Sequence, residues 1–167
     1  LLTLPVWALA QTVIPPKTNT ATPFAIVIDE ASYQKTQEAV EAYRDVIEKD
    51  GLGTYIIYDD WWNPAPIREK LIELHGQTRS PLEGAAFLGD IPIVMVRDGQ
   101  HLTSAFKMYQ RRNWQQSSIA SDRYYDDFGL QFDYIKQDSL QPLYHYVSLR
   151  ADSKQVLSRT IYSGRIM

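Results

Sequence analysis

The sequence contains no cysteine among its 167 residues. This absence excludes disulfide bonds, zinc sites with thiolate ligands and a thiol nucleophile within the chain. An excess of positive charge is also missing, because the formal net charge is -3. Without a basic surface to attract phosphate groups, we expect no nucleic-acid partner. No glycine-rich phosphate loop follows the first two predicted strands, which argues against dinucleotide binding.

The composition that remains is that of one globular domain. Hydrophobic residues make up 44% and charged residues 22% of the chain, and the length is sufficient to bury a core. Tyrosine (11) and tryptophan (4) are abundant. Such side chains supply buried area and also surfaces that bind partners or sugars.

The first ten residues resemble the tail of a secretory signal peptide. An apolar stretch runs into Ala8-Leu9-Ala10, a small-x-small cleavage pattern, and Gln11 would be the first mature residue. The alternative is a first buried strand or helix. We therefore expect a secreted or cell-envelope protein with a linker at 11–23, which is rich in Thr and Pro. No other stretch is long and apolar enough to span a bilayer.

Residues 24–96 alternate between apolar runs and amphipathic segments. Strands are predicted at Phe24–Asp29, Thr54–Tyr58 and Ala85–Leu88, with helices at Ser32–Asp50 and between Asn63 and Gly76. This alternation predicts an α/β fold with neighbouring parallel strands and right-handed crossovers. The expected buried stripes of the two helices are Val40, Tyr43 and Ile47, and Ile67, Leu71 and Leu74.

The apolar run Ala85–Val96 is interrupted at Gly89-Asp90 and at Pro92, and its first part, Ala85–Leu88, is predicted to be the central strand of the sheet, buried on both faces. Gly89 lets the backbone turn, so that Asp90 sits at the carboxyl end of the strand, where ligands and catalytic groups collect in open α/β sheets. Further strands are predicted at Tyr134–Ile135 and Leu143–Leu149. Because Ile161–Met167 looks like the start of another element, the domain is expected to be incomplete at its C-terminus.

Acidic residues provide the main candidate site. Asp90 ends the predicted central strand, and Asp122, Asp126, Asp127 and Asp133 crowd one downstream segment. Carboxylates on flexible backbone are suitable ligands for calcium, although the spacing is not that of an EF-hand. We predict Asp90, Asp122, Asp126 and Asp127 as ligands and expect Asp90 to lie close to the 121–127 loop. The alternative is an acidic turn that faces water.

Three short motifs occur in a recognisable order. They are FLGDIP (Phe87 to Pro92), Ser-Asp-x-x-Tyr-x-Asp (Ser121 to Asp127) and a strand that ends Gly164-Arg165-Ile166. Over residues 24–167 this order resembles the first half of the gingipain family of cysteine peptidases. The resemblance implies a caspase-like α/β fold, a three-layer sandwich with a mostly parallel sheet, and protein or peptide substrates.

The resemblance implies a catalytic His-Cys dyad beyond the Gly-Arg strand, outside this chain. It also implies frequent calcium binding. No catalytic residue is therefore assigned here, and His75, His101 and His145 have no cysteine to activate. A long insertion at 100–118 departs from the family pattern and is compatible with a relative that has lost peptidase activity.

The alternative function is a non-catalytic surface protein that binds a protein or a glycan. Its binding candidates are Trp61, Trp62 and Trp114, although aromatic pairs in loops also serve as lids on a core. The sequence does not indicate an oligomeric state.

Overall fold

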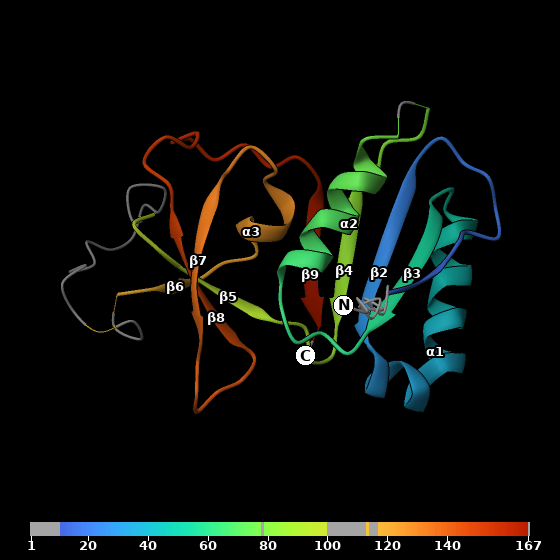
Figure 1. Ribbon diagram of the computed structural model, residues 1–167. Coiled ribbons are helices and arrows are strands. Elements are labelled where there is room, and N and C mark those ends of the chain that lie inside the picture. The colour runs from blue at the N-terminus through green and yellow to red at the C-terminus, as the bar shows by residue number, and fades with distance from the viewer. Residues whose placement is uncertain (1–10, 78, 100–112, 114–116, 167) are drawn as a thin grey trace, which may run out of the picture.

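The computed structural model describes residues 11–77, 79–99, 113 and 117–166. The predicted signal-peptide tail, His101, Trp114 and most of the 100–118 insertion lie outside these residues. Figure 1 shows two sheets side by side. The first contains five strands in the order β1-β3-β2-β4-β9, and the second contains four in the order β6-β5-β8-β7.

The predicted parallel sheet is confirmed in its three main strands. β2 (Pro23–Asp29) pairs in parallel with β3 (Gly53–Asp59) on one side and with β4 (Gly84–Leu88) on the other. β9 (Tyr162–Ile166) extends the parallel array beyond β4. The prediction that an element begins near Ile161 is thus confirmed, whereas the central strand is β2 and not β4.

The parallel strand predicted at Ala85–Leu88 is confirmed, whereas the rest of the apolar run to Val96 does not continue it. β4 ends at Leu88, and β5 (Ile93–Arg97) belongs to the second sheet. Gly89, at φ +72°, and Pro92 separate the two strands. Proline lacks an N–H for ladder pairing, and a positive φ breaks the extended geometry, so the chain crosses here from one sheet to the other.

The second sheet is mixed. β5 pairs in parallel with β8 (Tyr144–Leu149), and β7 (Phe132–Gln137) pairs with β8 in the antiparallel sense. The short β6 (Ile119–Ala120) pairs with the other edge of β5. The predicted strands at Tyr134–Ile135 and Leu143–Leu149 are therefore confirmed, with wider or slightly shifted bounds.

Helices lie on both faces of the first sheet. α1 (Glu30–Lys49) covers Ile26, Ile28 and Ile56 on one face. α2 (Ala65–His75) covers Ala25, Val27 and Ile57 on the other. The α2 face continues into the second sheet through Phe87, Ile91, Val94, Tyr125 and Val147. The chain is thus an α/β protein in which both sheets share one core.

The two helices differ in how well their buried faces were predicted. The α2 stripe of Ile67, Leu71 and Leu74 is confirmed, and the Asn63 side chain accepts the Ala65 N–H at 2.8 Å. The α1 stripe is confirmed at Val40 and Ile47, which pack in the core, but is wrong at Tyr43, which is 40% exposed. Arg44 and Glu48 are buried instead. Burial of Arg44 and Glu48 is possible because each has polar partners.

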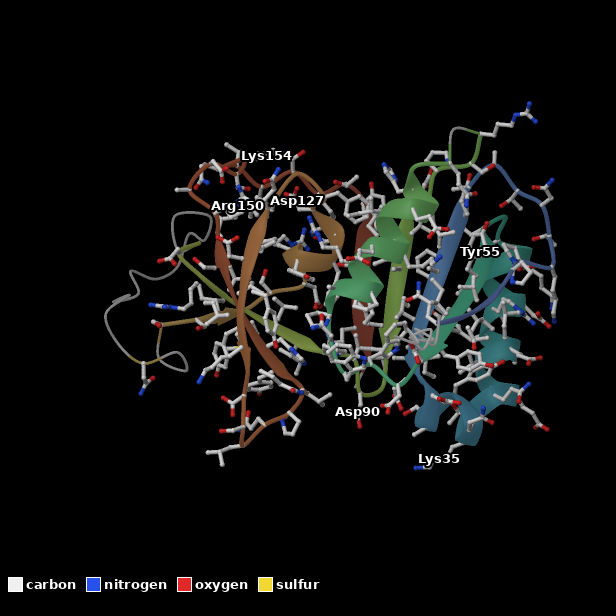
Figure 2. All side chains as sticks on the ribbon, in the orientation of Figure 1. Lys35, Tyr55, Asp90, Asp127, Arg150 and Lys154 are labelled. Carbon is white, nitrogen blue, oxygen red and sulfur yellow. The ribbon has the colours of Figure 1, made fainter. Side chains whose placement is uncertain are left out.

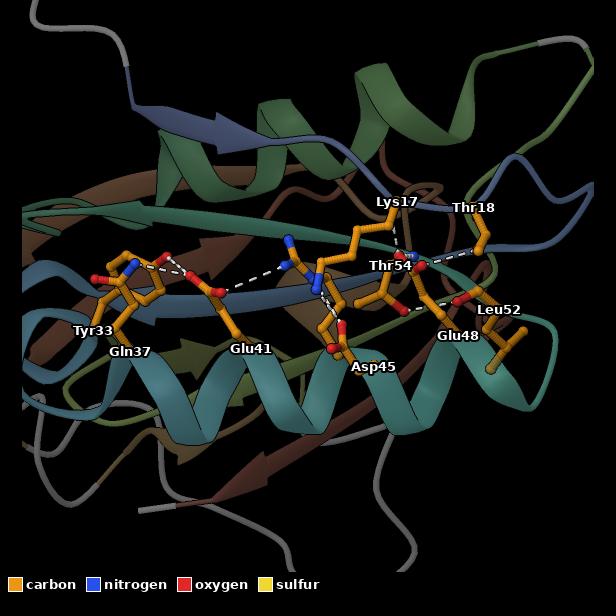
Figure 3. A network of polar contacts seen from close by, with 10 residues as sticks. Lys17, Thr18, Tyr33, Gln37, Glu41, Asp45, Glu48, Leu52 and Thr54 are labelled. Atoms are coloured by element: carbon orange, nitrogen blue, oxygen red, sulfur yellow. Dashed lines mark hydrogen bonds and ion pairs between the residues drawn. The ribbon is translucent and has the colours of Figure 1, made fainter.

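The prediction of a linker at 11–23 is also corrected by the structure. β1 (Thr12–Ile14) pairs antiparallel with the outer edge of β3. Beyond it, the carboxylate of Glu48 accepts the Lys17 N–H at 3.0 Å, the Thr18 hydroxyl at 3.0 Å and the Thr54 N–H at 3.2 Å. Figure 3 shows this network at the end of α1. The segment is therefore bound to the domain.

Glu48 gives the fold a predictable acid sensitivity. Burial by itself raises the pKa of Glu48, but the hydrogen bonds from Thr54, Lys17 and Thr18 outweigh it, so the pKa lies below its ordinary value. A lowered folded-state pKa contributes stability above the unfolded-state pKa of about 4.3, and that contribution is lost as the pH falls through the folded-state pKa.

We expect Glu48→Gln to lower the free energy of unfolding at pH 7 by roughly 1–2 kcal/mol, because one oxygen acceptor and the charge are lost. The variant should also lose less stability than the parent between about pH 5 and 3. Urea unfolding over this range measures both effects. Glu38→Gln, exposed on the same helix, is the matched control, and equal behaviour of the two variants would contradict the assignment.

Candidate functional site: the carboxyl edge of the first sheet

The carboxyl ends of the parallel strands meet at one edge of the first sheet. β2 ends at Asp29, β3 is followed by Asp60, and β4 is followed by Gly89 and Asp90. Together with Glu30 these carboxylates line an open pocket of about 570 Å³. This edge is where open α/β sheets generally bind ligands. We call it the edge pocket.

Asp29 organises the floor of the edge pocket. Its Oδ1 accepts the Ser32 N–H at 2.8 Å, which caps α1, and its Oδ2 accepts the Asp90 N–H at 2.8 Å. Burial raises the pKa of Asp29, but these hydrogen bonds outweigh it and the pKa is lowered. Asp29 therefore remains ionised and fastens the β4 turn to the start of α1.

The position of Gly89 admits no side chain. A Cβ there would overlap the Asp29 carboxylate and lie 2.7 Å from the Ser32 hydroxyl. The residue also has φ +72°, a region that L-residues adopt at a cost. The close approach of β4 to the capped helix thus depends on glycine.

The two neighbouring tryptophans have different environments. Trp61 lines the edge pocket, is only 6% exposed, and donates its indole N–H to the Ile28 carbonyl at 2.8 Å. Trp62 is 72% exposed. Trp61 is therefore a lid on the core, and of the two only Trp62 remains available to a partner.

The acidic segment 121–127 lies between the sheets. It contains the short helix α3 (Arg123–Asp126), and the Ser121 hydroxyl accepts the Arg123 N–H at 3.3 Å. The Tyr125 hydroxyl donates to the Pro92 carbonyl at 2.8 Å. The loop is therefore attached two residues after Asp90.

Each predicted acid of this segment has protein partners. Asp122 pairs with Arg165 at 2.7 Å. Asp126 accepts from Arg123 at 2.6 Å and from the Ser163 hydroxyl at 2.5 Å. Burial raises the pKa of Asp126, only partly offset by these donors. Asp127 accepts the Gly129 N–H at 3.2 Å and the Ser158 N–H at 2.6 Å.

Asp90 and Asp127 are not brought together. Figure 2 shows Asp90 at the lower end of β4 and Asp127 well away from it. Within the described part of the chain, no group of three or more His, Cys, Asp or Glu side chains has a geometry suited to a metal ion. Asp133 lies on β7, in the second sheet. The acids of the 121–127 segment instead accept from protein donors: Asp122 from Arg165 of β9, Asp126 from Arg123 within α3, and Asp127 from backbone N–H groups.

Calcium therefore remains a hypothesis for this protein. If an ion binds to Asp122 or Asp127, a chelator should lower the midpoint of thermal unfolding and added calcium should restore it, by mass action on the folded state. An unchanged midpoint in the presence of chelator would leave the protein donors as the sole partners of these carboxylates.

Two arginines connect the first sheet and α2 to the segments around α3, and sequence reasoning assigned neither a role. Arg165, on β9, donates to the carbonyls of Ile91 at 2.8 Å and Pro92 at 3.3 Å in addition to its pair with Asp122. Arg165 is part of the Gly164-Arg165-Ile166 motif, which was predicted to end a strand, but the sequence does not indicate what its side chain contacts. Its guanidinium lies 5.5 Å from the Phe87 ring centroid.

Arg68, on α2, is the second of these arginines. It donates to the carbonyls of Tyr124 and Leu130, the latter at 2.7 Å, and lies 5.2 Å from the Tyr124 ring centroid. Burial lowers the pKa of the Arg68 guanidinium. Nothing in the sequence distinguishes Arg68 from the lysine and arginine residues that are exposed on the surface of a helix.

The histidines in the described residues serve packing. His75 Nδ1 lies 2.7 Å from the Leu82 carbonyl oxygen, at the end of α2. His145 is buried on β8, 3.2 Å from the Tyr134 hydroxyl, and burial lowers its pKa. Neither histidine lines the edge pocket.

Comparison with known proteins finds no match. No family model, no curated protein and no solved structure is similar to this chain. Among the described helices, none has both the length and the apolar character needed to cross a membrane.

Proposed function

We propose that this chain is the N-terminal portion of a secreted or cell-envelope cysteine peptidase of the gingipain-like type. Its own residues would form the scaffold and one wall of the substrate cleft, and the His-Cys dyad would come from another part of the full-length protein. The proposal includes a caspase-like three-layer sandwich, for which the helices on both faces of a largely parallel sheet are the support.

The main support for this proposal is the outer edge of β9, which is exposed and unpaired in the described part of the chain. This strand is at the end of the sheet, and no described strand pairs with its outer edge. On the α1 side, Tyr162 is 70% and Ile166 is 60% exposed, and a Cβ added at Gly164 would meet no atom within 4 Å. Proteins usually cover an apolar edge of this kind, because it is open to unwanted strand pairing. Further strands and a helix of a complete peptidase domain would cover it.

The edge pocket supports the same proposal. In open α/β sheets, substrates bind beyond the carboxyl ends of the strands, and this edge is the one that Asp29, Asp60 and Asp90 line. A peptide would lie across this edge in contact with these acids. A nucleophile would have to be added to the site, since the chain has no cysteine.

We expect the 167-residue chain alone to hydrolyse no peptide bond, because it has no thiol and no recognisable alternative nucleophile. The full-length protein should cleave peptides and lose that activity after thiol alkylation. Both are measured with fluorogenic peptide libraries. Turnover by the purified 167-residue chain that is abolished by one substitution within it would contradict the proposal, as would a full-length protein without a cysteine.

The alternative is a non-catalytic surface protein that binds a protein or a glycan on the same scaffold. The observation in its favour is Trp62, which is 72% exposed at the edge of the fold. A full-length protein that lacks peptidase activity but whose partner binding is lost in Trp62→Ala would favour this alternative.

A further inference from the structure

A second pocket lies at the opposite end of the first sheet, between β3 and the segment that precedes β2. Its volume is about 260 Å³, and its lining includes Lys17, Thr18, Asn19, Thr20 and Tyr55. Figure 2 labels Tyr55 beside the blue segment. We call it the Tyr55 pocket, and it is separate from the edge pocket and from the proposed peptidase function.

The wall of the Tyr55 pocket is held in place before any ligand arrives. Glu48 fixes Lys17 and Thr18 through the hydrogen bonds described above. The Thr20 hydroxyl accepts the Gly53 N–H at 2.7 Å and donates to the Thr22 carbonyl at 3.1 Å. A Cβ at Gly53 would lie only 2.8 Å from that hydroxyl oxygen, so the segment sits directly against β3. A preorganised wall lowers the entropic cost of binding.

Polar groups in the pocket remain available. Asn19 is exposed and makes no side-chain hydrogen bond within the described residues, so its amide can donate twice and accept through its oxygen. The hydroxyl oxygens of Thr18 and Thr20 retain acceptor capacity. Tyr55 is half-buried, packs on the core and lines the pocket.

The residues that line the Tyr55 pocket argue against several classes of ligand. No carboxylate lines the pocket, which disfavours a cation. The one cation of the lining, Lys17, is paired with Asp45 at 2.7 Å, which reduces its attraction for a phosphate or sulfate. The hydroxyl and amide groups disfavour an apolar ligand, because their hydrogen-bonding capacity would be lost on burial.

We infer that the Tyr55 pocket binds a neutral sugar ring, such as the end of a glycan. The Thr and Asn groups provide donors and acceptors for sugar hydroxyls, and the Tyr55 ring provides an apolar surface for the C–H face of the ring. The volume is slightly below the roughly 300–1,000 Å³ of drug-sized ligand pockets, which suits one ring. An open pocket with few contacts gives a dissociation constant on the order of 1 mM.

The test is a titration of the ¹⁵N-labelled 167-residue chain followed by amide chemical shifts. The probes are the methyl glycosides of glucose, galactose, mannose and N-acetylglucosamine, each to about 50 mM so that millimolar binding saturates. At least one should produce saturable shifts at the amides of Lys17, Asn19, Gly53 and Tyr55. Inorganic phosphate should produce none.

Two pairs of variants test the residues. Asn19→Ala and Tyr55→Leu should each weaken binding at least about fivefold, since each removes a direct contact while the fold is retained. Gln77→Ala and Tyr43→Leu remove an exposed amide and an exposed ring elsewhere and should bind as the parent does. The inference is overturned if no glycoside gives saturable shifts, if phosphate alone does, or if Asn19→Ala and Tyr55→Leu bind normally.

Discussion

Arg68→Ala should lower the free energy of unfolding by roughly 3 kcal/mol and the thermal midpoint by about 6–12 °C. The substitution leaves the carbonyls of Tyr124 and Leu130 without their donor. It also removes the cation that lies over the Tyr124 and Phe132 rings at 5.2 and 5.7 Å. Buried carbonyls without partners cost about 1–3 kcal/mol each, which makes this the largest effect expected for a charged residue of α2.

Denaturant unfolding measures the change in the free energy of unfolding. Two further variants serve as comparisons. Arg68→Lys keeps the charge but loses the planar fork of donors, so its stability should lie between the parent and the alanine variant. Arg79→Ala, at an exposed position, should change the free energy of unfolding by less than about 0.5 kcal/mol. An Arg68→Ala variant as stable as Arg79→Ala would refute the role of Arg68 in joining α2 to α3 and the loop before β7.

Gly89→Ala should also destabilise the protein by about 3 kcal/mol, for a different reason. The positive φ of 72° costs roughly 1–2 kcal/mol for an L-residue. The new Cβ would in addition displace the Asp29 carboxylate, and the loss of a helix cap costs about 1 kcal/mol.

Two other glycines separate these contributions. Gly51 has φ +93° but open space around it, so Gly51→Ala should show the backbone cost alone. Gly164 has open space and no positive φ, and Gly164→Ala should be neutral or slightly stabilising. Equal stability of the Gly89 and Gly51 variants would show that the contact with Asp29 contributes nothing.

The parallel core of the fold could be predicted from local patterns. Phe24–Asp29 and Thr54–Tyr58 are short apolar runs, each followed by a helix with recognisable ends, and these signals depend on neighbouring residues alone. The crossing from β4 to β5 could not be predicted, because Gly89 and Pro92 indicate an interruption without indicating which sheet receives the next strand. Pairing partners of β5 and β9 are distant in the sequence and leave no local pattern.

The candidate sites were predicted less well, for a related reason. The acids at 122, 126 and 127 were recognised as a group, but the distant partners Arg165 of Asp122 and Ser158 of Asp127 are identified only by the tertiary structure. Asp29 carried a usable signal, since an Asp directly before a helix is a favourable cap. Glu48 and Arg44 carried none, because a charged residue on a helix is normally exposed.

The pairing of β9 with β4 also has a consequence for the order of folding. Phe87 pairs with Arg165 only after the whole second sheet has been synthesised between them. Contacts between residues so distant in the chain form slowly, because a large loop must close first. The unit made of β2, α1, β3, α2 and β4 can assemble from nearer neighbours. Attachment of β9 is then the late step of folding, and until it occurs the Asp122 carboxylate lacks Arg165 and the outer edge of β4 is open to other chains.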